Sequence, residues 1–72
     1  MNNPGILLRN WRTKNKLGPA DAAARVDVER QTWWRWENGH SFVALTNLPK
    51  VSEVTGISKQ KLRPDLAQAV KA

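Results

Sequence analysis

Apolar residues recur every three or four positions along most of this chain of 72 residues, and glycine and proline separate the resulting segments. That spacing places apolar side chains on one face of an α-helix, whereas a half-buried strand alternates polar and apolar residues. No segment of five or more residues alternates in that way. The pattern therefore predicts an all-α protein.

The first amphipathic helix is predicted over residues 4–16. Leu8, Trp11 and Asn15 share one face of this helix at helical spacing. Most of the basic residues in the same segment lie on the other faces. This division into an apolar and a basic side is typical of a helix that packs one face on a core.

The second and third predicted helices are joined by a short break. Gly18 serves as the N-cap of the second helix and Pro19 as its first residue, where the missing N–H of proline costs nothing. An alanine-rich run follows and favours helix. The third helix is predicted over residues 30–38, with Trp33 and Trp36 three residues apart on its inner face.

Two shorter helices are predicted in the second half. Apolar residues recur there at three-residue steps, at Leu45, Leu48, Val51 and Val54. A proline falls inside this pattern and is tolerated only in a first turn, so the fourth helix is expected to begin near Leu48. A fifth helix is expected to begin after Ser58, to bury Leu62 and to end before Pro64. Residues 65–72 then form a short tail helix or a frayed end.

Charge and composition narrow the class of partner. Twelve Lys and Arg against six Asp and Glu give a formal net charge of +6. This basic excess points to a polyanion, either nucleic acid or an anionic membrane surface. The length fits one small domain, and no apolar run is long enough to cross a membrane, so a cytoplasmic location is expected. Because there is no cysteine and His40 is the single histidine, we expect no metal site, no cofactor and no enzymatic activity.

Residues 17–39 contain the pattern most informative about function. Two short helices joined by about three residues form a helix-turn-helix, which is predicted over residues 18–38. Small side chains on the first helix allow the second to cross it closely, and these are Ala22, Ala23 and Val26. The second helix presents Arg30, Gln31 and Arg35 outward. Arg and Gln are the side chains best suited to bidentate contacts with guanine and adenine in the major groove.

In these residues the chain resembles the lambda-repressor-like family, the Cro/cI-type regulators that are also called the xenobiotic-response-element family. The resemblance runs through residues 11–12, 17–39 and 54–58 and covers most of the chain. Residues 62–66 are similar to the ending of small prophage Cro-like proteins. The resemblance implies a compact five-helix DNA-binding domain with a central helix-turn-helix, in a bacterial or phage nucleoid-associated regulator.

The resemblance also implies which residues contact DNA. Arg30, Gln31 and Arg35 match the base-contacting positions of the family. Asn38 begins a turn whose backbone amides approach phosphate. The complete set of candidate DNA-contacting residues is Glu29, Arg30, Gln31, Thr32, Trp34, Arg35, Asn38, His40 and, ahead of the helix-turn-helix, Lys14.

Other positions match the family pattern in part. Arg12 and Glu37 match a partly buried ion pair that ties the first helix to the end of the third. Asp27 stands where the family has a glycine in the turn, and aspartate tolerates positive φ better than most residues. Glu29 replaces the usual serine N-cap, and Trp33 replaces a β-branched aliphatic residue in the core.

Several apolar residues have more than one compatible role. Trp34 is turned outward by the phase of its helix, where it contacts DNA, packs at a subunit interface or covers a neighbouring side chain. Ile6 and Leu7, together with Leu66 and Val70, form either a dimer contact or a tail folded over the core. The sequence leaves these alternatives open.

The predicted function is sequence-specific binding of double-stranded DNA by a transcriptional regulator, a phage-type repressor. We expect a homodimer, formed in solution or only on DNA, on a pseudo-palindromic operator. The alternative is an antitoxin that binds a toxin and its own promoter. A toxin partner is not indicated, because only a short tail follows Pro64. Membrane binding is not expected, because it would need aromatic residues opposite the basic face, and the tryptophans here belong to the core.

Overall fold

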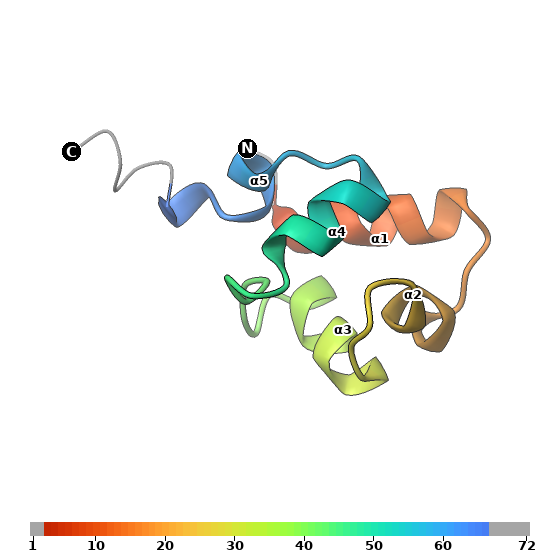
Figure 1. Cartoon of the computed structure of the whole chain (residues 1–72). Helices are drawn as coiled ribbons and strands as arrows, with labels where there is room; N and C mark the ends of the chain where they lie inside the picture. The colour runs from red at the N-terminus through yellow and green to blue at the C-terminus, as the bar shows by residue number, and fades with distance from the viewer. Residues whose placement is uncertain (1–2, 67–72) are drawn as a thin grey trace.

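The computed structural model describes residues 3–66, and its helices pack around a shared core (Figure 1). The helices are α1 (Pro4–Lys14), α2 (Pro19–Arg25), α3 (Arg30–Glu37), α4 (Leu48–Thr55) and α5 (Lys59–Leu62). Residues 64–66 add a further helical turn. Because residues 3–66 contain no strand, the prediction of an all-α fold is confirmed.

The helices begin where proline and small polar residues predict. Pro19 follows Gly18, which has the extended backbone of an N-cap, and α4 carries its proline in the first turn. The Ser58 hydroxyl accepts a hydrogen bond from the backbone N–H of Lys61 at 3.3 Å and so caps α5. The Asn3 side chain caps α1 in the same way, accepting from the N–H of Gly5 at 2.8 Å.

The first helix ends two residues earlier than predicted. α1 stops at Lys14, and Lys16 has a φ of 57°, which turns the chain away from the helix axis. Asn15 is the C-cap and is exposed, and its Nδ2 donates to the carbonyl of Trp11 at 2.7 Å. The placement of Asn15 on the apolar face was therefore wrong. A short amide side chain at a helix end donates to a backbone carbonyl more readily than it packs on a core.

The third and fourth helices lie close to their predicted bounds. α3 ends at Glu37, one residue before the predicted end, with Asn38 as C-cap and Gly39 at a φ of 74°. α4 begins at Leu48 as predicted. Leu45, however, does not extend the apolar stripe of α4: it lies in the preceding turn and is 61% exposed.

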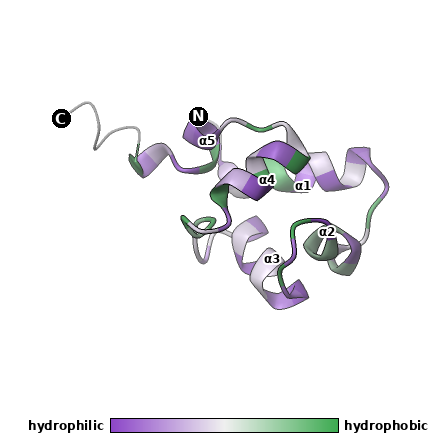
Figure 2. Ribbon diagram, in the orientation of Figure 1, coloured by the Kyte–Doolittle hydropathy of each residue, from purple (hydrophilic) through white to green (hydrophobic). Residues whose placement is uncertain are grey.

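The core contains one buried face from each helix. α3 contacts both α1 and α2, and α4 contacts α5. The buried residues are Leu8, Ala22, Ala23, Val26, Trp33, Trp36, Val43, Leu48, Val51 and Leu62. α3 is drawn in white and purple along its length (Figure 2), so its apolar face depends on the indole rings of Trp33 and Trp36 rather than on aliphatic side chains.

Backbone meets backbone where the start of α1 crosses the end of α3. Gly5 is buried there. A Cβ atom at this position would lie 2.7 Å from the carbonyl oxygen of Trp36 and 2.9 Å from the carbonyl carbon of Glu37. Only glycine permits so close an approach. The distance between the two helices is thus set at Gly5.

The last described turn packs one side chain against the core. Leu66 is partly buried and packs against the core residues. Of the two predicted alternatives, a dimer contact and a tail folded over the core, the second requires this contact of Leu66. Ile6 remains 54% exposed and Leu7 is half-buried. Val70 lies outside the described residues. No helix within residues 3–66 is long and apolar enough to cross a membrane.

Candidate nucleic-acid interface

α2 and α3 form a helix-turn-helix, as the sequence predicts (Figure 1). Ala22 and Ala23 are buried, and their small side chains let α3 cross α2 closely. The turn closes when the N–H of Val28 donates to the carbonyl of Ala23 at 3.0 Å. Asp27 takes a φ of 58°, the left-handed conformation expected at this position, and its carboxylate lies 3.3 Å from Lys50 Nζ on α4. This ion pair is exposed and contributes little to stability.

The first turn of α3 has no side-chain cap. Glu29 occupies the N-cap with extended backbone, but its side chain accepts no hydrogen bond from the helix. The first backbone N–H groups of α3 therefore point out of the helix end, where the helix dipole is positive. Arg30 and Gln31 are exposed beside them, and Thr32 is half-buried.

The outer face of α3 is polar and accessible. Arg35 is exposed one turn after Gln31, and both lie on the side of the helix opposite Trp33 and Trp36, which are 0% and 3% exposed. The structure therefore brings the three predicted base-contacting side chains to one surface. Lys14 is also exposed, at the end of α1.

Trp34 and His40 form a stacked pair that the sequence did not predict. Their ring centroids are 5.1 Å apart and the ring planes differ by 16°. Trp34 is nevertheless 50% exposed. The two residues are six positions apart, which is not a helical spacing, so only the turn at Gly39 brings them together. No local pattern in the sequence would have revealed this contact.

The carboxylate of Glu37 joins α3 to α1. Arg12 donates to it twice, from Nε to Oε2 at 2.6 Å and from Nη2 to Oε1 at 3.1 Å. The predicted ion pair is therefore present. Two further donors were not predicted: Trp33 Nε1 donates to Oε2, and Arg9 Nε donates to Oε1 at 3.3 Å. Arg12 also donates to the carbonyl of Leu17 at 3.2 Å and so holds the segment before α2.

This network determines the ionisation of Glu37. Its side chain is only 6% exposed, and burial alone would raise the pKa of the carboxyl. The hydrogen bonds from Arg12 and Trp33, with the positive charge of Arg12, outweigh burial, so the pKa of Glu37 lies below its usual value. The hydrogen bond to Glu37 likewise raises the pKa of Arg12. The ion pair is charged at neutral pH and fixes the end of α3.

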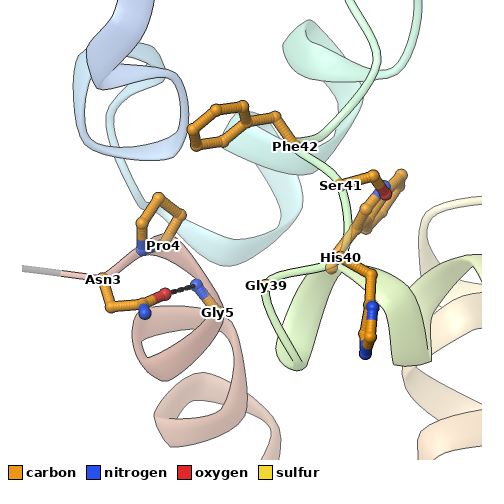
Figure 3. Close-up of a pocket in the computed structure, with 8 residues that line it drawn as sticks. Asn3, Pro4, Gly5, Gly39, His40, Ser41 and Phe42 are labelled. Atoms are coloured by element: carbon orange, nitrogen blue, oxygen red, sulfur yellow. Dashed lines mark hydrogen bonds between the residues drawn. The ribbon is translucent and has the colours of Figure 1, made fainter.

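A pocket of about 180 Å³ lies between the start of α1 and the turn after α3 (Figure 3). Pro4, Trp36 and Phe42 supply its apolar lining, and Asn3 and Ser41 lie among its polar residues. Phe42 is 46% exposed. In the described part of the chain, no three His, Cys, Asp or Glu side chains come together in a way that would hold a metal ion.

Two short helices in close crossing, joined by a tight turn and followed by an accessible polar face on the second, define a helix-turn-helix domain. Residues 5–66 match the family described as "Helix-turn-helix domain", and the chain belongs to this family. It is therefore a domain of the kind found in DNA-binding regulators. No curated protein and no solved structure shows a significant match to the chain.

Proposed function

We propose that this protein is a sequence-specific transcriptional repressor of the Cro/cI type that places α3 in the major groove of double-stranded DNA. The observation that carries the proposal is the joint exposure of Arg30, Gln31 and Arg35 on a helix whose opposite face is buried. Arg forms paired hydrogen bonds with guanine O6 and N7, and Gln does so with adenine N6 and N7. The helix-turn-helix presents such a helix to the groove by its N-terminal residues.

Contacts to phosphate would fix the register of α3. The uncapped N–H groups behind Glu29 and the positive end of the helix dipole favour a phosphate oxygen. Lys14 adds an exposed positive charge, and Thr32 and Asn38 offer neutral hydrogen bonds at the two ends of α3. The net charge of +6 supports the same partner.

The length of α3 favours two copies on one operator. Its eight residues span about 12 Å, which covers only three to four base pairs. A site this short recurs too often in a genome to give useful specificity. We therefore propose a homodimer, assembled on a pseudo-palindromic operator with half-sites about one helical turn apart.

Binding to a duplex selected from a random library is expected to be specific and to weaken steeply with salt. Each phosphate neutralised by Lys or Arg contributes about −0.9 to the slope of log K against log[salt]. Fluorescence anisotropy at several salt concentrations, with selected and scrambled duplexes, measures both quantities. Equal affinity for the two duplexes at every salt concentration would exclude sequence-specific binding.

Two single variants separate base contacts from phosphate contacts within that experiment. Gln31→Ala is expected to cost about 1–3 kcal/mol on the selected duplex and to relax the preference at one position in each half-site. Lys14→Ala is expected to weaken selected and scrambled duplexes alike. Both residues are exposed, so thermal unfolding should remain close to wild type and confirm that the variants are folded. A selected site without two-fold symmetry would contradict the dimeric mode.

A further inference from the structure

We infer that Trp34 recognises the methyl group of one thymine in each half-site, and that His40 holds the indole ring in place for this contact. The inference rests on the proposed DNA-binding function and adds a base preference to it. It is carried by two observations, the position of Trp34 on α3 and its stacking on His40.

Trp34 lies on the surface that carries the proposed base contacts. It follows Gln31 by three residues and Arg30 by four, which makes these side chains neighbours on the helix. Half of Trp34 is exposed, whereas Trp33 and Trp36 on either side of it are buried. An indole in this position enters the groove together with Arg30 and Gln31.

The turn after α3 fixes the orientation of the indole. Asn38 Nδ2 donates to the carbonyl of Trp34 at 2.8 Å, and the N–H of His40 donates to the carbonyl of Arg35 at 3.0 Å. With Gly39 in the left-handed conformation, the chain reverses and lays the imidazole of His40 against one face of the indole. The His40 ring points away from Phe42 (Figure 3).

A ring that is held before binding loses less conformational entropy when it binds. Because His40 covers one face of the indole, that face is closed to a DNA base. The opposite face and the ring edge remain for contact. These are apolar except for one N–H donor. The indole therefore lacks the two donors that guanine requires, the donor and acceptor that adenine requires, and the acceptor that cytosine requires.

Thymine offers the matching surface. Its C5-methyl group is the apolar feature that a base pair displays in the major groove. A contact between this methyl group and the indole removes apolar area from water on both partners. Of the four bases, thymine is therefore the one that Trp34 favours.

Deoxyuridine provides a sharp test because it differs from thymidine only by that methyl group. Each thymine of the selected operator is replaced in turn by uracil, and Kd is measured for the wild type and for Trp34→Ala. At one position per half-site, uracil is expected to weaken wild-type binding about four-fold, the effect of burying one methyl group. Trp34→Ala is expected to bind the thymine and uracil duplexes equally at that position.

Two further variants serve as controls. Phe42→Ala removes an exposed aromatic side chain outside α3 and should retain the full thymine preference. His40→Ala keeps the indole of Trp34 but removes the imidazole ring that stacks on it. This variant should show a smaller preference for thymine over uracil and should still bind the selected duplex specifically.

The experiment distinguishes failure of the thymine inference from failure of the proposed DNA-binding function. If the wild type binds its selected duplex specifically but tolerates uracil at every position, the inference is wrong while the function stands. The same holds if Trp34→Ala keeps the uracil penalty, because another residue then contacts the methyl group. Absence of any specific binding would overturn both the function and the inference.

Discussion

Replacing Trp33 with alanine is expected to destabilise the protein by about 3–5 kcal/mol, enough to unfold most molecules of a domain this small. Trp33 is 0% exposed, and its ring lies 5.8 Å from that of Trp11 and 6.0 Å from that of Trp36, measured between centroids. The substitution leaves a large cavity between α1 and α3. It also removes the Nε1 donor to Glu37. Circular dichroism during thermal or urea unfolding measures the loss.

Trp34→Ala is the matched control, because it removes the same side chain from the adjacent position. Because the indole of Trp34 is half exposed, Trp34→Ala should change the free energy of unfolding by about 0.5 kcal/mol or less. The two variants are compared under identical conditions. A larger loss of stability for Trp34→Ala than for Trp33→Ala would contradict the burial of α3 described above.

Glu37→Ala is expected to cost about 3 kcal/mol, the second-largest effect. The carboxylate is the common acceptor for Arg9, Arg12 and Trp33. Without it, the Arg12 guanidinium stays largely covered, at 17% side-chain exposure, with its charge uncompensated. Urea unfolding at neutral pH measures the loss. Asp65→Ala removes a carboxylate that is 40% exposed, against 6% for Glu37, and leaves Arg63 its hydrogen bond to the carbonyl of Val43, so it should change stability less.

Acid titration of stability tests the same carboxylate. The pKa of Glu37 is lower in the folded than in the unfolded protein, so its contribution is present at neutral pH and is lost as pH falls below about 4.5, through the folded-state pKa. Glu37→Gln should remove much of this acid dependence. A smaller slope should remain, because the hydrogen bond from Arg63 also lowers the pKa of Asp65. An unchanged acid profile in Glu37→Gln would show that the network does not stabilise the fold.

The sequence predicts the helices well where their ends are set by local chemistry. Gly18, Ser58 and Gly39 mark helix ends because a proline neighbour, a capping hydroxyl and a positive φ act within a few residues. The burial of Trp33 and Trp36 follows equally from helical phase. These features require no knowledge of how the helices pack.

Contacts made across the fold were harder to predict. The exposure of Leu45 depends on a turn that removes it from the stripe of α4, although its spacing fits that stripe. The stack of His40 on Trp34 depends on the chain reversal at Gly39. For Glu37, the family resemblance supplied the partner Arg12, but Arg9 became visible only once α1 and α3 were placed together. Trp33 lies four residues before Glu37 on α3, so its hydrogen bond is a local contact at helical spacing that was not predicted.

The contact at Gly5 provides a position at which a substitution would act from a distance on the proposed DNA contacts of α3. Glycine there lets the start of α1 rest directly on the last carbonyl groups of α3. Any added side chain acts as a wedge between the two helices and must tilt or shift α3. Such a change would alter how deeply α3 enters the groove while every side chain proposed to contact DNA stayed the same. If α3 binds the groove as proposed, selection for altered operator affinity can act at Gly5, which lies against the C-terminal carbonyl groups of the helix.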